Sequence, residues 1–179
     1  MAVEVVPHSP EWPRQLNRLA AQVRECLNGL PAAVEHVDST AVPGLAAKPV
    51  LDMHVIVDRR LLGGPSNSLE LAGYRHRGDL GPLDRETFLA PNDRSRRNVY
   101  VCVAGTLHVR NHLAARDVLR IHPGLRERFS AVKLALAEEP EMGIDRYTAG
   151  KSAILQEFLA ASDLTAAESC RILELDSGT

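Results

Sequence analysis

The residues best suited to chemistry fall in one stretch of this chain, "VEHVDSTAVPGLAAKPVLDMHVIV", residues 34–57. Its first half holds Ser39 and Thr40 ahead of a loop rich in proline and glycine, and its second half holds Asp52 and His54 within an apolar run. Hydroxyl and backbone N–H groups at the start of a helical turn bind phosphate. A carboxylate beside an imidazole can bind a divalent cation or move protons. The pattern indicates a site for an anion and a metal ion.

Each of these residues also has a structural interpretation. Ser39 and Thr40 are the residue types that cap a short helical turn, here one over residues 40–46. Asp52 is flanked by apolar residues, and a carboxylate buried on a strand needs a metal or a cationic partner. That partner can equally be Lys48 or an arginine in a salt bridge.

His54 lies two residues after Asp52, so the alternation of side chains along a strand places both on the same face. A neutral imidazole there can be a transition-metal ligand or a general base. The alternative is a histidine with a purely structural role. Together with Asp38, which precedes Ser39, these residues form a candidate catalytic and metal-binding set: Asp38, Asp52 and His54.

Candidate cations for an anionic substrate surround this stretch in the sequence. Lys48 can neutralise a phosphate or pair with Asp38. Among many arginines, we select three as substrate-binding residues because a planar guanidinium suits phosphate and carboxylate: Arg85, Arg97 and Arg116. The alternative is a solvated basic face.

Tyr147 and Lys151 stand four residues apart, one turn of a helix, and so share a helix face. They either line the substrate pocket or tie the last helices to the sheet.

The predicted elements describe an α/β (α+β) domain. An apolar stripe at helical spacing predicts a helix over residues 9–28 with Ser9 as its N-cap, and "GGPSNS" at 63–68 is expected to be a loop before a short helix that ends at 69–73. From Thr106 onward the pattern is helical, with a last helix over 165–175. We expect one domain over 1–162 and a helical extension of it over 163–179. The predicted strands are residues 33–37, 50–57, 74–78, 85–90 and 98–103.

Composition narrows the class of partner. The 179 residues carry a net charge of −2 and are 4% aromatic, so neither a basic field nor a stacking surface for nucleic acid is expected. The three cysteines are far apart and are expected to be reduced thiols in a cytoplasmic protein. No apolar run has transmembrane length, so no membrane partner is expected. A homodimer is compatible with the sequence.

The stretch "EHVDSTAVPGLAAKPVLDM" resembles the GrpB family, whose pattern here is EHxGSTxVPGLxxKPxxDI. Further similarity lies in residues 112–123, 129–137 and 147–159, so the resemblance covers about residues 3–161. It implies the nucleotidyltransferase-like fold, a mixed β-sheet flanked by helices with a helical C-terminal part. The same domain occurs in some bacterial dephospho-CoA kinases. In the wider superfamily the loop holds a triphosphate, and strand carboxylates hold Mg²⁺ or Mn²⁺ for nucleotidyl transfer.

This sequence departs from that pattern at chemically important positions. Asp38 replaces the loop glycine, and His54 stands where a second carboxylate is expected. Asn98 and Tyr100 replace two histidines of the family pattern. No acid stands in that strand to complete a trio of carboxylates, which argues against two-metal nucleotidyl transfer. Three hypotheses follow: a transferase for a nucleotide or other anionic small molecule with a metal at Asp52, a catalytically silent binding module, or an enzyme that uses His54 as acid–base catalyst without a nucleotide.

Overall fold

The computed structural model describes residues 3–78, 84–92 and 94–177, so most of the predicted "GDLGP" loop lies outside the described residues. The chain divides into two compact units. We call the first the helical unit; it consists of Met1–Ser9, Asp38–Pro49 and Asn111–Thr179. We call the second the sheet unit; it consists of Pro10–Val37 and Val50–Arg110.

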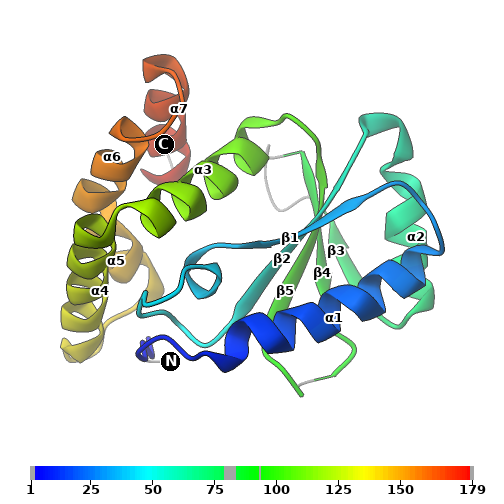
Figure 1. The fold of residues 1–179 in the computed structure, drawn as a ribbon, viewed down its shortest axis with the longest axis horizontal. Coiled ribbons are helices and arrows are strands. Elements are labelled where there is room, and N and C mark those ends of the chain that lie inside the picture. The colour runs from blue at the N-terminus through cyan, green and yellow to red at the C-terminus, as the bar shows by residue number, and fades with distance from the viewer. Residues whose placement is uncertain (1–2, 79–83, 93, 178–179) are drawn as a thin grey trace. The chain divides into compact units, whose positions relative to one another are not determined.

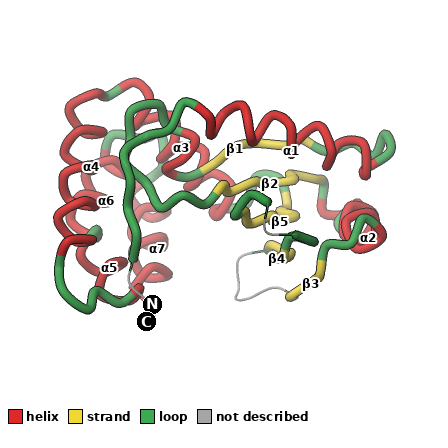
Figure 2. The backbone as a smooth tube through the Cα atoms, turned by 90° about the horizontal axis from the view of Figure 1, so that it is seen from below, coloured by secondary structure: helices red, strands yellow, loops and turns green. Residues whose placement is uncertain are grey.

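The sheet unit is built on a mixed sheet with the strand order β1-β2-β5-β4-β3 (Figure 2). β2 and β5 are parallel, and the other neighbouring strands are antiparallel. The mixed sheet confirms the expected fold class, and each predicted strand lies within one residue of its observed bounds. The strands are β1 (Ala33–Val37), β2 (Leu51–Val57), β3 (Arg75–Gly78), β4 (Arg85–Leu89) and β5 (Arg97–Val103).

One face of the sheet is apolar and is covered by α1 (Glu11–Leu27), which lies along β1 and β2 (Figure 1). The predicted stripe of α1 is buried against this face, and Met53, Val55 and Val99 are fully buried beneath it. The helix begins at Glu11, after Pro10, two residues later than the predicted start at Ser9. It ends as expected, because Asn28 adopts the left-handed conformation that terminates helices.

The predicted loop "GGPSNS" is also wrong, since these residues form most of α2 (Gly63–Leu71). Pro65 is the third residue of the helix, where a missing N–H costs no hydrogen bond. Leu69, which is fully buried, anchors the helix in the core. Tertiary packing therefore overrides the local preference of two glycines and a proline.

The other face of the sheet is polar, as the register of the strands shows. His54 lies opposite Glu35 in β1 and opposite Tyr100 in β5. Asp52 lies opposite Val37 and Asn98. Residues opposite one another in neighbouring strands share a face, so these side chains form two adjacent rows.

The helical unit contains most of α3, together with four further helices that contact one another in chain order (Figure 1). The helices are α3 (Leu107–Ile121), α4 (Pro123–Glu138), α5 (Ile144–Gly150), α6 (Ser152–Ala160) and α7 (Ala166–Ser177). The expected helical C-terminal part is confirmed. Among the described residues, no helix combines the length and the apolar character needed to cross a membrane.

Candidate functional site

The site loop, residues 38–49, is hydrogen-bonded at several points to the rest of the helical unit. The guanidinium of Arg120 in α3 donates from Nε and Nη2 to the Ala41 carbonyl at 3.1 and 2.9 Å. The Ala46 N–H donates to Ser130 Oγ in α4 at 3.0 Å. Near its end, Ala47 exchanges two backbone hydrogen bonds of 2.9 Å with Val6. The loop is thus held in one conformation by bonds from three separate segments.

The site loop begins with a single turn of 3-10 helix, Ser39–Ala41. The Ser39 hydroxyl of this turn contacts a buried lysine. Lys133 of α4 donates from Nζ to Ser39 Oγ at 2.9 Å, and Lys133 is 2% exposed. Thr40, the other predicted hydroxyl residue, is buried within the turn. The predicted phosphate-binding loop therefore has an ammonium group directly behind its serine.

Two further lysines complete this cluster, and the sequence contains three lysines in all against eighteen arginines. The Nζ atoms of Lys48 and Lys151 lie 5.7 and 4.7 Å from the centre of the Tyr147 ring. Tyr147 is almost fully buried, and burial, helped by the charge of Asp38, raises its pKa to about 12. Tyr147 thus stays neutral and offers its ring face to two ammonium groups.

The pKa of Lys133 reports the balance of charge in the cluster. Burial lowers it from 10.5 to about 7, although Asp38 raises it, and the neighbouring charges of Lys151 and Lys48 lower it further. The carboxylate of Asp38 therefore does not compensate the burial of this ammonium group. Among the described residues that shift its pKa, cationic groups thus outnumber carboxylates.

Asp38 holds an unusual backbone conformation, with φ 59° and ψ −165°. This region is essentially restricted to glycine, the residue that the family pattern has at this position. The Asp38 carboxylate accepts from the Ser39 N–H at 2.6 Å and from the Ser39 hydroxyl at 3.0 Å. The backbone at residue 38 thus keeps a conformation typical of glycine. The carboxylate of Asp38 at the same time occupies two donors of the loop, the N–H and the hydroxyl of Ser39.

The carboxylate of Asp38 is also surrounded by cations. Part of the residue reaches solvent, yet its neighbours are close enough that loss of water would by itself raise its pKa. The positive charges of His112, Lys133 and Lys151, with the Ser39 hydrogen bond, outweigh that effect and lower the pKa. Asp38 is therefore ionised at neutral pH and acts as an internal counterion.

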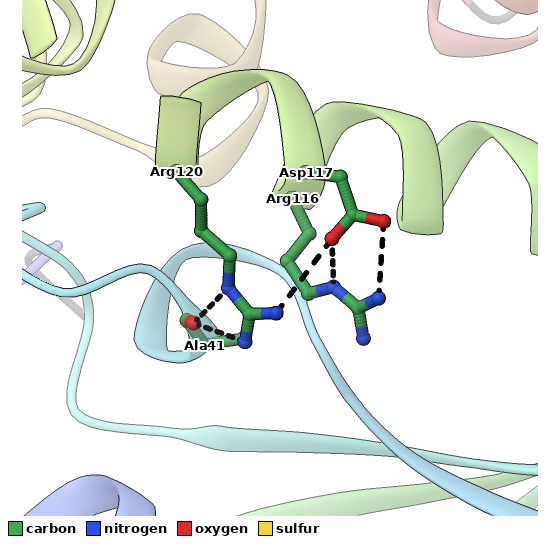
Figure 3. A network of polar contacts seen from close by, with 4 residues as sticks. All are labelled: Ala41, Arg116, Asp117 and Arg120. Carbon is green, nitrogen blue, oxygen red and sulfur yellow. Dashed lines mark hydrogen bonds and ion pairs between the residues drawn. The ribbon is translucent and has the colours of Figure 1, made fainter. Parts of the chain in front are cut away.

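Arg116 and Arg120 both contact Asp117 in α3, and Arg120 also reaches the site loop, as Figure 3 shows. Arg116, a predicted substrate-binding residue, donates from Nε and Nη2 to Asp117 at 2.7 and 3.2 Å. Arg120 reaches the Ala41 carbonyl, and its Nη1 lies 3.6 Å from Asp117. Arg120 thus positions the site loop, whereas the guanidinium of Arg116 is engaged by its neighbour.

In the sheet unit, Asp52 is held by the adjacent parallel strand. Asn98 donates from Nδ2 to Asp52 Oδ1 at 2.9 Å. The amide of Asn98 is thus one partner of this carboxylate. This bond fixes one carboxylate oxygen of Asp52. Because Asp52 is paired with Asn98, its carboxylate lies on the polar face of the sheet.

His54 and Arg85, both predicted site residues, meet around Tyr100 and His108. His54 is 0% exposed and lies with its ring centre 5.0 Å from that of His108 and 5.7 Å from that of Tyr100. The Arg85 guanidinium lies 4.9 Å from the Tyr100 ring centre, and its Nη1 is 3.5 Å from His108 Nε2. The polar face of the sheet therefore carries here three aromatic rings and the guanidinium of Arg85.

The structure brings five predicted site residues into one cluster in the helical unit: Asp38, Ser39, Lys48, Tyr147 and Lys151. Arg97 lies in the sheet unit and binds the preceding loop instead. Sequence analysis missed Lys133, although a lysine four residues after Phe129, on the apolar stripe of a helix, was a usable signal. Nothing in the sequence pointed to Arg120 as the residue that holds the loop.

The predicted metal set can be tested against this arrangement. No set of three histidine, cysteine or acidic ligands in the described part of the chain includes Asp38 or Asp52. Asp38 faces three cationic side chains, which disfavour a further cation. Mg²⁺ is commonly held by one or two carboxylates together with waters and substrate phosphates, so Asp52 fits such an ion and Asp38 does not.

Comparison with known sequences places these features in a family. The family model described as "GrpB protein" matches residues 2–161. A UPF0157 protein of Halalkalibacterium halodurans is 31% identical over 166 residues, covering 92% of this chain and 84% of the relative. A dephospho-CoA kinase of Mycolicibacterium paratuberculosis is 27% identical over 175 residues, covering 83% of this chain but 43% of the kinase.

Two solved structures have a similar fold. The crystal structure of the conserved protein GrpB from Enterococcus faecalis is 29% identical, with a TM-score of 0.75 over 88% of this chain and 98% of that one. A cytoplasmic RNA terminal U-transferase is 13% identical, with a TM-score of 0.59 over 84% of this chain and 48% of that one. At this identity the second likeness shows the fold alone, which is nucleotidyltransferase-like.

Replacing Lys133 by methionine should change how stability depends on pH. The unfolded chain keeps a lysine proton up to about pH 10.4, whereas folded Lys133 loses its proton near pH 7. Between these values the folded state binds fewer protons, so wild-type stability rises with pH by up to about 1.4 kcal/mol per pH unit relative to Lys133→Met. Urea unfolding of both proteins between these pH limits measures the difference. The Lys48→Met variant, which removes an exposed lysine of the same cluster, should keep the rise; parallel curves for wild type and Lys133→Met would contradict the assignment.

Two substitutions of Asp38 separate its backbone strain from its charge. Asp38→Gly and Asp38→Asn both remove the negative charge, but asparagine keeps a side chain at φ 59°. We expect Asp38→Gly to be more stable than Asp38→Asn by about 1–3 kcal/mol, the usual cost of such a conformation. Chemical denaturation of the pair gives this difference directly. Equal stabilities would show that the backbone at this position is not strained.

Proposed function

This chain belongs to the GrpB family, and from that premise we propose that it is a transferase that binds a nucleotide or another phosphorylated small molecule on the site loop. The observation that carries the proposal is the hydrogen bond of 2.9 Å from the buried Lys133 to Ser39. A buried ammonium group behind a serine turn is an arrangement that serves an anion and destabilises the fold without one.

The charge of the cluster supports a phosphate group as the ligand. Lys48 and Lys151 supply cations, Lys133 supplies an amino group whose pKa is lowered to about 7, and Asp38 supplies one carboxylate. A bound phosphate would raise the pKa of Lys133 again and would compete with Asp38 for the Ser39 N–H and hydroxyl. Asp38 therefore favours a ligand that offers enough negative charge to displace its carboxylate, as a polyphosphate does.

The polar face of the sheet supplies the other part of the proposal. Asp52, oriented by Asn98, would hold Mg²⁺ or Mn²⁺, which when bound neutralises charge on phosphate oxygens. In nucleotidyl transfer, an acceptor hydroxyl or amine attacks the α-phosphorus, the bond to the bridging oxygen breaks, and pyrophosphate leaves. Asp52, which is half-buried, is the candidate to take the acceptor proton, because His54 is fully buried.

The names of two similar proteins are compatible with this class of ligand. The structural neighbour is an RNA terminal U-transferase, and a sequence relative is a dephospho-CoA kinase; both names imply phosphorylated substrates. The proposal for this chain is limited to that shared chemistry, a phosphorylated small molecule. It does not extend to RNA, since 4% of the residues are aromatic and the net charge is −2.

A binding module without catalysis is the second candidate function. It is favoured by Asp38, which already occupies the donors of Ser39, and by the lack of a second carboxylate beside Asp52 on β2. Such a module would bind its anionic ligand without a metal ion. The two candidates differ in their response to a chelator.

Thermal unfolding with nucleoside triphosphates tests both candidates. We expect at least one of ATP, GTP, CTP and UTP to stabilise the wild type with Mg²⁺ or Mn²⁺, by roughly 2.7 kcal/mol at 100 times its Kd. Lys133→Met and Lys151→Met should lose this stabilisation. Asp52→Asn, which can still accept the Asn98 hydrogen bond, should lose the metal-dependent part.

The charge-matched control is Arg171→Gln, which removes an exposed cation that pairs with Glu174 on α7. This variant should respond to nucleotide as the wild type does. Stabilisation that is insensitive to EDTA and unchanged in Asp52→Asn would favour the binding module. Absence of any response in a folded wild type, or a response that survives in Lys133→Met, would refute the proposed site.

A further inference from the structure

The sheet unit contains an open pocket of about 670 Å³ that is separate in sequence from the site loop. It lies at the beginning of β5 and next to Val50, the residue before β2. Its volume is in the range of sites for small molecules, roughly 300–1,000 Å³. Its polar lining consists of Arg75, Arg96, Arg97, Asn92, Ser95 and Asn98.

Arg97 is the most buried of the polar residues that line this pocket, with 9% of its surface exposed. Its Nη1 donates to the carbonyls of Ser95 and Asn92 at 3.0 and 3.5 Å and to Asn92 Oδ1 at 3.3 Å. Its guanidinium carbon lies 5.7 Å from the centre of the Tyr74 ring. These bonds fix the guanidinium, but all its acceptors are neutral.

The buried Nε of Arg97 has no hydrogen-bond partner within the described ranges. No carboxylate there pairs with Arg97 either. Arginine stays charged at every physiological pH, so Arg97 is a permanent cation for which the described part of the chain supplies no counterion. A buried charge without a partner is strongly destabilising, and an anion in the pocket would relieve that cost.

A second guanidinium reaches the pocket from the edge strand β3. Arg75 lies opposite Leu89 of β4, which also lines the pocket. Arg75 is exposed, and the described residues offer it no ion pair. Together, Arg75 and Arg97 present two forks of N–H donors, the geometry that binds carboxylate and phosphate in bidentate fashion.

We propose that this pocket binds a small molecule that carries a carboxylate or phosphate group, held by Arg97 and Arg75. The proposal does not depend on the function proposed for the site loop, because the pocket belongs entirely to the sheet unit. Asn98 lines the pocket and also holds Asp52, so a ligand here would lie against the residue that orients that carboxylate. The pocket is therefore also placed to influence chemistry at Asp52.

Titration with inorganic phosphate and with citrate tests the proposal, with chloride at matched ionic strength as the reference. We expect at least one of these two oxyanions to raise the melting temperature of the full chain at millimolar concentration, and the one that does so identifies the class of ligand. Arg75→Gln should weaken this binding about tenfold or more, since a charged hydrogen bond is worth at least 1.4 kcal/mol. Arg75 is chosen because the bonds of Arg97 to Asn92 and Ser95 remain intact.

Arg77→Gln is the matched control, because Arg77 is an exposed arginine on the same strand that does not line the pocket. It should bind as the wild type does. In a Lys133→Met background, where the site loop is disabled, the stabilisation that depends on Arg75 should persist. The proposal is overturned if neither oxyanion stabilises the wild type beyond chloride, or if the Arg75 and Arg77 variants weaken binding equally. Loss of binding in Lys133→Met would also overturn it, by assigning the anion to the site loop.

Discussion

The buried ammonium group of Lys133 is the interaction on which the site loop depends. It is 2% exposed, donates to Ser39, and faces a carboxylate that does not compensate its loss of water. Such a group costs folding energy, and the surrounding bonds from Arg120, Ser130 and Val6 hold the loop over it regardless. A bound anion would offset the cost of burying the Lys133 amino group. The packing of the helical unit is in this way linked to the proposed binding of a phosphorylated ligand.

The sheet unit provides a rigid surface with an apolar and a polar side, and this surface orients Asp52. The parallel pair β2 and β5 sets Asp52 beside Asn98, and their hydrogen bond fixes the carboxylate on the polar side. Met53 and Val99, the next residues along the two strands, point into the core under α1. An acid on a central strand therefore keeps a defined direction because its neighbours are packed.

The strands and their faces were predictable because the alternation of side chains is a local property of the sequence. β1 and β2, and the shared face of Asp52 and His54, follow from it. The first two turns of α2 were not predictable, since burial of Leu69 outweighs glycine and proline preferences. The replacement of glycine by Asp38 was visible in the sequence, but its positive φ and its cationic neighbours depend on tertiary structure. The same holds for Lys133, whose partner Ser39 is distant in the chain.

The most direct measurement is an NMR titration of the lysine side chains in protein labelled with ¹³C-lysine, where three lysines give three sets of signals. We expect that one of them, identified by its loss in Lys133→Met, titrates near pH 7 in the free protein. Its pKa should rise when tripolyphosphate is added, because a bound anion stabilises the charged form. Titration of all three lysines near the ordinary value of about 10.4, or a Lys133 signal that does not respond to the anion, would contradict it.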